Sequence, residues 1–183
     1  MSEEYIIRNC APTLAGLKTG SMFTCPVTSD TELRNALRSL NRRLSKKGLR
    51  LIPLRISDKS ALIYVFRPGR LSEDLKNTTT ESLLTCRGYS TDNCAGCIQQ
   101  LIRRIREERD FPHEVGLFLG YPPEDVHGFI ENKSCNHKCV GCWKVYGDED
   151  AAKRRFALYK KCNRIYWDQW TKGIDLEKLT DAE

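Results

Sequence analysis

The sequence lacks several features that would place it in a familiar class. It has no N-terminal basic segment followed by an apolar stretch, and no apolar run approaches the roughly 18 residues that a membrane span needs. We therefore expect a cytoplasmic protein with no membrane partner. Glycine-rich phosphate-binding motifs of the Gly-x-Gly-x-x-Gly or Walker type are also absent. Because no low-complexity linker interrupts the chain, we expect one domain over residues 1–173.

The charge of the chain is mild and its length is ordinary. A chain of 183 residues can bury a core without disulfides, and a formal net charge of +6 permits an anionic partner without requiring one. Four basic residues recur at every fourth position and would form one stripe on a helix: Arg34, Arg38, Arg42 and Lys46. No RNA- or DNA-binding motif accompanies them, so we favour a solvated helix face over nucleic-acid binding.

Cysteine is the one residue type whose number points to chemistry. The chain has nine cysteines, and disulfides are rare in the cytosol. An odd number of thiols in that compartment indicates metal binding, redox chemistry or simple core filling more than a disulfide framework. An interpretation as small packed apolar residues or incidental surface thiols suits four of them best: Cys10, Cys25, Cys86 and Cys162.

The remaining five cysteines lie in two nearly repeated turns, Cys94-Ala95-Gly96-Cys97 and Cys139-Val140-Gly141-Cys142, with Cys135 just before the second. Soft thiolates at Cys-x-x-Cys spacing favour zinc or an iron-sulfur cluster. The spacing from Cys135 to Cys142 also resembles the radical adenosylmethionine cluster motif, but too little chain follows it for that class of enzyme. We therefore predict a metal site formed by Cys94, Cys97, Cys135, Cys139 and Cys142.

A redox role is the alternative for the first pair of cysteines. Cys94 and Cys97 precede a helix predicted from residue 98 to about residue 109, and a helix N-terminus lowers the pKa of a thiol. No proline lies in the turn, and the strand that precedes a thioredoxin-type turn is not evident. A metal-binding or redox accessory protein is our first functional hypothesis.

Hydrophobic periodicity predicts an α/β or α+β fold. Leu33, Leu37, Leu40 and Leu44 mark an amphipathic helix from Ser29 that Gly48 ends. Extended apolar segments on either side of a polar turn predict a β-hairpin of strands 49–56 and 60–67, and short strands are expected over 115–119 and 143–146. Further helices are expected over 71–86, from 122 and from 148, with a charged, frayed tail over 174–183. We expect one compact domain with a mixed sheet of four to five strands packed with helices.

Several segments together resemble one family. They are residues 14–18 (Leu-Ala-Gly-Leu-Lys), 111–122 (Phe-Pro-His-Glu-Val-Gly-Leu-Phe-Leu-Gly-Tyr-Pro), 124–126, 128–129 and 143–148 (Trp-Lys-Val-Tyr-Gly-Asp). They are similar to the domain of unknown function 3793 family, from anaerobic bacteria, over most of the chain. The resemblance implies a family and no activity. It implies an anaerobe's cytosol, in which a redox or iron-handling protein is the expected partner.

His113 and Glu114 form the candidate acid-base pair, because an imidazole and a carboxylate can transfer protons in a pocket. An enzyme or small-molecule-binding protein centred on them is our second hypothesis, and it predicts a concave pocket lined by residues 111–121. The structural alternative makes His113 the cap of a turn and pairs Glu114 with a basic residue. A nucleophile-base pair of Cys25 and His113 has no local signature.

Two other kinds of residue, histidine and tryptophan, each have two possible roles. His127 and His137 are extra metal ligands or, as we favour, ordinary surface histidines. Trp143, Trp167 and Trp170 stack on a planar cofactor or pack in a core, which is the commoner fate of tryptophan.

Overall fold

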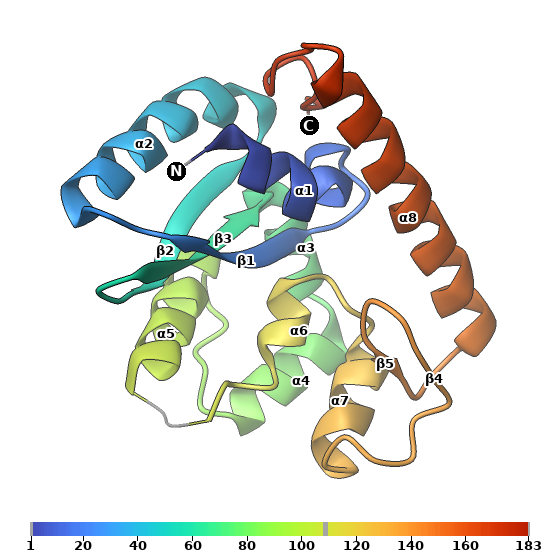
Figure 1. Ribbon diagram of the computed structural model, residues 1–183. Helices are drawn as coiled ribbons and strands as arrows, with labels where there is room; N and C mark the ends of the chain where they lie inside the picture. Colours follow the sequence, from blue (N-terminus) through green and yellow to red (C-terminus); the bar gives the residue numbers. More distant parts are fainter. Residues whose placement is uncertain (1, 108–109, 183) are drawn as a thin grey trace. The chain divides into compact units, whose positions relative to one another are not determined.

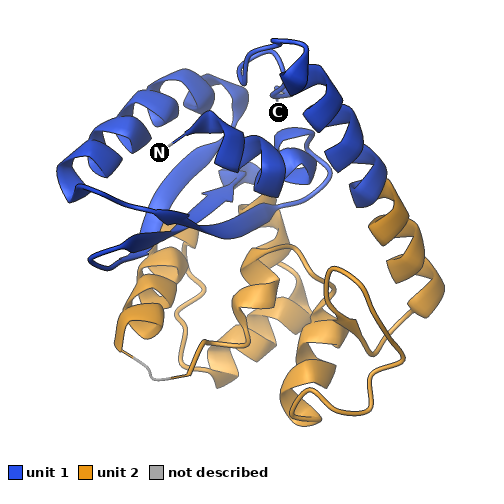
Figure 2. Ribbon diagram, in the orientation of Figure 1, with its two compact units in different colours: residues 1–69, 159–183 blue, residues 70–158 orange. Residues whose placement is uncertain are grey.

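The computed structural model describes residues 2–107 and 110–182. It divides into two compact units (Figure 2): unit 1 consists of Met1–Gly69 and Tyr159–Glu183, and unit 2 of Arg70–Leu158. Unit 2 is thus inserted between two stretches of unit 1. Two compact units can belong to one domain, so the single domain over residues 1–173 stays a prediction. Within the described ranges no helix is long and apolar enough to cross a membrane.

Unit 1 is a three-stranded antiparallel sheet with helices on one face. Its elements are α1 (Glu3–Leu14), β1 (Gly20–Pro26), α2 (Asp30–Leu44), η1 (Ser45–Lys47), β2 (Arg50–Ile56), β3 (Ser60–Phe66) and the C-terminal part of α8 (Glu149–Thr171). The strand order is β1-β3-β2, and β2 and β3 form the predicted hairpin. Figure 1 shows α1 and α2 over the same face of this sheet.

The predicted leucine helix is confirmed as α2. The Ser29 side chain accepts a hydrogen bond from the Glu32 amide and caps the N-terminus of the helix. All four predicted leucines of this helix are buried. Gly48, with φ at +74°, ends η1 in the left-handed conformation that glycine adopts without strain.

The core of unit 1 lies between the sheet and its helices. Ile63 and Val65 of β3 belong to this core and are fully buried. Burial of each such side chain stabilises the fold by about 1.5–3 kcal/mol. Trp167 and Trp170 pack against this core, which confirms the core-packing interpretation for these two residues. The sequence analysis made no prediction for α1 or β1.

Arg67 is a charged side chain in the interior of unit 1. Its guanidinium is 1% exposed and donates hydrogen bonds to the carbonyl oxygens of Thr13, Leu14, Lys47 and Asp181, at 2.6 to 3.2 Å. The Thr13 and Leu14 carbonyls lie at the end of α1, and the Lys47 carbonyl lies at the end of η1. Arg67 therefore provides hydrogen-bond donors for carbonyl groups at helix ends. One side chain thereby ties three separate segments of unit 1 together.

The C-terminal segment is packed rather than frayed, so that expectation for residues 174–183 is wrong where the structure describes them. Leu176 and Leu179 are 0% and 4% exposed and belong to the core of unit 1. The Asp181 amide donates to the Leu14 carbonyl oxygen at 3.1 Å. Leu176, Leu179 and Thr180 share one side of a helical turn, so the segment is amphipathic despite its charges.

Unit 2 is mainly helical. Its elements are α3 (Pro68–Leu75, which begins in unit 1), α4 (Thr78–Cys86), α5 (Cys94–Glu107), α6 (Val115–Phe118), α7 (Pro123–Glu131), β4 (Cys139–Val140), β5 (Lys144–Val145) and the first part of α8. The helical segment 71–86 is confirmed, as two helices separated at Asn77, whose side chain caps α4. The expected end of α5 at residue 109 lies outside the described residues.

The strand predicted over residues 115–119 is wrong. Residues Val115–Phe118 form α6, in which the Leu119 amide donates back to the Val115 carbonyl oxygen. A run of four apolar residues fits a buried helical turn as well as a strand. In the described residues the expected mixed sheet of four to five strands is replaced by the three-stranded sheet of unit 1 and the two-stranded antiparallel β4-β5 ribbon of unit 2.

Candidate functional site

The two cysteine pairs lie on different elements of unit 2. Cys94 and Cys97 are in the first turn of α5, whereas Cys139 is in β4 and Cys142 follows it in the β4-β5 turn. Figure 1 shows α5 and the β4-β5 ribbon on opposite sides of this unit. In the described part of the chain, no three His, Cys, Asp or Glu side chains are grouped so as to hold a metal ion. The zinc or iron-sulfur site stays a prediction.

The first cysteine pair does not have the environment of an activated thiol. Cys97 is fully buried, and its thiol donates to the Ser90 carbonyl oxygen at 3.0 Å. Burial raises the pKa of the Cys97 thiol, and the nearby Cys94 and Asp92 raise it further. Burial also raises the pKa of Cys94. These shifts are opposite to the lowered thiol pKa that the helix N-terminus led us to expect, because the thiols are desolvated.

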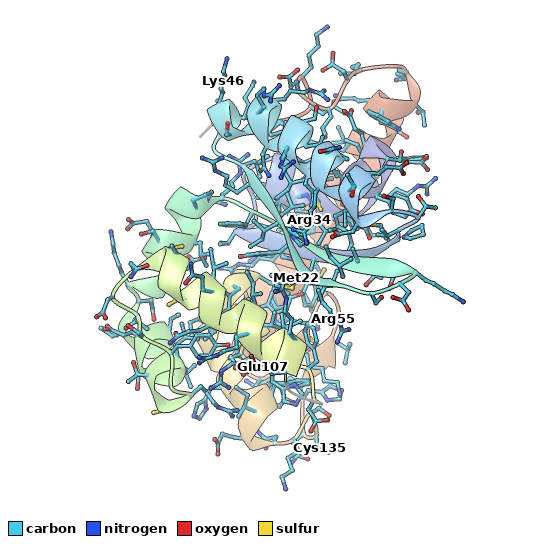
Figure 3. The ribbon with its side chains drawn as sticks, turned by 90° about the vertical axis from the view of Figure 1, so that its left-hand side faces the viewer. Met22, Arg34, Lys46, Arg55, Glu107 and Cys135 are labelled. Carbon is cyan, nitrogen blue, oxygen red and sulfur yellow. The ribbon has the colours of Figure 1, made fainter. Side chains whose placement is uncertain are left out.

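The other cysteines divide between surface and core. Cys135 and Cys142 are exposed and Cys139 is half-buried. Figure 3 shows Cys135 at the periphery of unit 2. Cys10 and Cys25 are in the core of unit 1, Cys162 is buried and Cys86 is exposed, which agrees with packed residues and an incidental surface thiol. The pairing of Cys25 with His113 stays a prediction.

Glu114 has a structural environment. Its side chain is 1% exposed, and its Oε1 accepts a hydrogen bond from the Tyr89 hydroxyl at 3.0 Å. The Arg104 guanidinium lies 3.4 Å from the same oxygen and stacks over the Tyr89 ring. The predicted pairing of Glu114 with a basic residue is thus present. A buried carboxylate held in this way orders the packing of α5 against the segment before α6.

The His113 side chain lies in a different environment from that of Glu114, although the two residues are adjacent in the sequence. It lines a pocket of about 330 Å³ in unit 2, and its ring meets the Phe129 ring edge-on at 5.0 Å between centroids. Glu114 is not part of this lining. The structure therefore does not bring His113 and Glu114 together as an acid-base pair, because neighbouring side chains diverge at the start of α6.

We call this cavity the aromatic pocket. Its lining comes from the segment before α6, from α6 and α7, and from the β4-β5 ribbon, and most of it is aromatic or aliphatic. The lining residues are Phe111, His113, Val115, Gly116, Tyr121, Asp125, Val126, Phe129, Val140, Trp143 and Lys144. Phe111 and Val140 are 43% and 61% exposed, which is unusual for large apolar side chains and leaves apolar surface beside the pocket.

One wall of the pocket is built on Trp143. Its ring stacks on Tyr121 with centroids 4.8 Å apart and meets Phe156 edge-on at 4.6 Å. The indole Nε1 donates to Asp125 Oδ2 at 2.6 Å. Such a ring, fixed by a hydrogen bond and two aromatic neighbours, presents a rigid face.

Asp125 holds the pocket together and was missed as a functional residue by the sequence analysis. It is 3% exposed, and its Oδ1 accepts the amides of Tyr146 and Gly147, each at 2.7 Å. With the bond from Trp143, this carboxylate joins the first turn of α7 to the end of β5. The sequence signals were its place in the Pro-Pro-Glu-Asp helix opening and in segment 124–126 of the family resemblance.

Gly116 allows the elements behind the pocket to approach closely. A Cβ at this position would lie 2.7 Å from Val126 Cγ2 and 3.1 Å from Tyr121 Cδ2. A side chain here would push α6 away from α7. The glycine therefore sets the separation of two lining segments.

The polar end of the pocket is formed by Lys144 beside Phe129. The Lys144 ammonium lies 5.8 Å from the Phe129 ring centroid and donates to the Ser134 carbonyl oxygen at 2.9 Å. Ser134 and its neighbours Lys133 and Asn136 have positive φ angles, between +46° and +65°. Non-glycine residues rarely adopt this conformation, and here it shapes the loop that presents the carbonyl to Lys144.

A second, polar cavity of about 240 Å³ adjoins the first and shares Tyr121 and Asp125 with it. Its charged residues are Asp74, Glu124, Asp125, Asp148 and Arg155. Asp148 accepts the Ala151 amide at 2.9 Å, which engages the N-terminus of α8 and lowers the pKa of the Asp148 carboxyl. This cavity contains no feature that selects one ligand class.

The remaining candidate residues are on surfaces. Arg34, Arg38 and Arg42 are exposed on α2, and Arg34 pairs with Asp30 at 2.9 Å. Figure 3 shows Lys46 at the periphery of unit 1. His127 and His137 are exposed as well, which agrees with the favoured surface interpretation.

Comparison with known proteins gives a family and nothing more specific. No curated protein and no solved structure matches the chain. The family model described as "Protein of unknown function (DUF3793)" matches residues 6–180. That match includes most of both units and every segment that carried the resemblance, so the chain belongs to the domain of unknown function 3793 family.

Proposed function

We propose that this protein binds a small, planar, largely apolar molecule in the aromatic pocket. The observation that carries the proposal is the lining: four aromatic rings and three valines around a cavity of about 330 Å³. Cavities of roughly 300–1,000 Å³ with apolar walls and a few polar groups are typical of ligand sites in proteins.

The shape of the walls favours a flat ligand. Tyr121 and Trp143 are stacked with their ring planes 29° apart, and Phe129 lies on the Lys144 side of the pocket. A planar molecule can lie against such faces in offset stacking, which is worth about 0.5–1.5 kcal/mol per aromatic pair beyond the burial of area.

The walls are also held in place before any ligand binds. Trp143 is fixed by Asp125, and Asp125 by the backbone amides at the end of β5. A preorganised site loses less conformational entropy on binding than a mobile one. Binding, rather than proton transfer by His113 and Glu114 together, is therefore the role that this arrangement favours.

A matched pair of variants tests the proposal. Naphthylmethanol serves as the neutral planar probe, titrated by calorimetry against the full chain. Phe111→Ala removes a pocket ring that is 43% exposed, and Leu158→Ala removes an apolar side chain that is 45% exposed on α8 and does not line the pocket. We expect Phe111→Ala to weaken binding about fivefold through lost apolar contact, and Leu158→Ala to leave it unchanged. Equal affinity in both variants would refute the proposal.

A zinc or iron-sulfur centre at the five cysteines is a second proposal. What favours it is that Cys135, Cys139 and Cys142 lie within one short, half-buried to exposed segment, where thiols can rearrange around an ion. Anaerobic purification followed by elemental analysis should then show metal that Cys139→Ser removes. Unchanged metal content and stability in Cys94→Ser and Cys139→Ser would contradict it.

A further inference from the structure

The two basic side chains of the aromatic pocket, His113 and Lys144, both lie beside Phe129. The centroids of the His113 and Phe129 rings are 5.0 Å apart. The Lys144 ammonium lies 5.8 Å from the Phe129 ring centroid. Both side chains line the cavity. Another part of the lining consists of Tyr121 and Trp143, whose rings are stacked with centroids 4.8 Å apart.

The acidic residue in the lining does not neutralise these two basic side chains. Asp125 accepts three hydrogen bonds of 2.6 to 2.7 Å, from Trp143 and from the amides of Tyr146 and Gly147. Its two oxygens are thereby engaged within the wall. In the part of the chain that the structure describes, neither His113 nor Lys144 forms an ion pair with a carboxylate.

Lys144 retains capacity to bind a ligand. Its ammonium carries three protons, and the Ser134 carbonyl oxygen accepts one of them. The ammonium is held at the pocket by this bond and by the Phe129 ring. A fixed cation at the edge of an apolar cavity attracts an anion more strongly than a mobile one in water, because less solvent screens it and less entropy is lost.

We infer that the ligand is a planar apolar monoanion, such as an aromatic carboxylate, with its charged group at Lys144 and His113 and its ring against Tyr121 and Trp143. The inference rests on the proposed function and adds the chemical class and the orientation of the ligand. Lys144 supplies the ionic contact, and His113 supplies a hydrogen-bond donor beside it. Cationic ligands are disfavoured at the same position by the Lys144 charge.

Two probes of similar shape distinguish the contribution of the charged group to the affinity from that of the aromatic ring. Naphthoate carries a carboxylate where naphthylmethanol carries a neutral hydroxymethyl group. We expect naphthoate to bind the unmodified protein about five- to tenfold more tightly than naphthylmethanol, as charge-assisted hydrogen bonds of this kind allow. Raising sodium chloride to about 0.5 M should weaken naphthoate binding and leave naphthylmethanol binding unchanged.

Two lysine variants locate the effect. Lys144→Met keeps the apolar stem and removes the charge, so it should abolish the preference for naphthoate over naphthylmethanol. Lys138→Met is the matched control, since Lys138 is exposed in the same loop and is not in the lining. Circular dichroism of each variant checks its fold, and the salt titration needs no variant at all.

The outcomes distinguish a failure of the anionic ligand class from a failure of the pocket as a binding site. Equal affinity for both probes, or a naphthoate preference that survives Lys144→Met, overturns the anionic ligand class while leaving the pocket as a binding site. If neither probe binds the unmodified protein, the proposed function fails together with the inference. A preference that high salt and Lys144→Met both remove supports the inference.

Discussion

Trp143 and Asp125, 18 residues apart in the sequence, share a buried hydrogen bond of 2.6 Å from the indole Nε1 to the carboxylate Oδ2. The other carboxylate oxygen accepts two backbone amides. This one side chain therefore orders both the wall of the aromatic pocket and the connection between α7 and β5.

Asp125→Asn should destabilise the protein by about 2 kcal/mol, because an amide nitrogen cannot accept the Trp143 N–H and a buried donor is left without a partner. The measurement is urea denaturation followed by circular dichroism. Asp110→Asn is the control, as Asp110 is exposed, and a change below about 0.5 kcal/mol is expected there. If the two variants unfold alike, the Asp125 contacts do not stabilise the fold.

Glu114→Gln should lower stability and spare ligand binding. The substitution removes the charge that pairs with Arg104 and receives the Tyr89 hydroxyl, at an expected cost of about 1–2 kcal/mol. Because Glu114 does not line the pocket, naphthylmethanol affinity should stay within about twofold of the unmodified protein. Lost affinity at unchanged stability would restore Glu114 as a functional residue.

Leu176→Ala should cost about 2–4 kcal/mol of stability, as expected for truncation of a fully buried leucine. Guanidinium denaturation measures this directly. Leu158→Ala is a suitable comparison, since that leucine is 45% exposed and its truncation leaves little cavity. A tail that frays would give no difference between the two variants.

Cys97 should be alkylated far more slowly than Cys135 and Cys142, which are exposed. Burial raises the pKa of the Cys97 thiol, so at about pH 8 the reactive thiolate is scarcer than in a free cysteine, and its rate should rise only at more alkaline pH. Iodoacetamide labelling with peptide mass spectrometry gives the order. In denaturant the three should react equally; rapid labelling of folded Cys97 contradicts the burial.

Elements with a clear period could be predicted from the sequence. The leucines of α2 recur at three to four residues between a serine cap and Gly48, and the β2-β3 hairpin consists of two apolar-rich segments joined by a polar turn, so local physics decides both. α6 could not be predicted in the same way, because Val115–Phe118 is a short apolar run that suits a strand equally well.

The candidate site was predictable only in part. The segment from Phe111 to Tyr121 was expected to line a pocket, and it supplies five of the lining residues. Yet Asp125 and Lys144 act through partners that only the tertiary fold brings near, and no spacing reveals that Glu114 turns away from His113. The cysteine turns gave the strongest pattern, but a shared motif does not fix whether two turns meet in space.

The hydrogen bonds of the buried Arg67 constrain the order in which contacts of unit 1 can form during synthesis. Its guanidinium binds the carbonyl oxygens of Leu14, at the end of α1, and of Asp181. In the sequence, all of unit 2 lies between these two residues of unit 1. Domains fold as units while synthesis proceeds from the N-terminus. Residues 70–158 therefore leave the ribosome before Asp181, so the Arg67 guanidinium can bind the Asp181 carbonyl oxygen only after the whole of unit 2 has been synthesised.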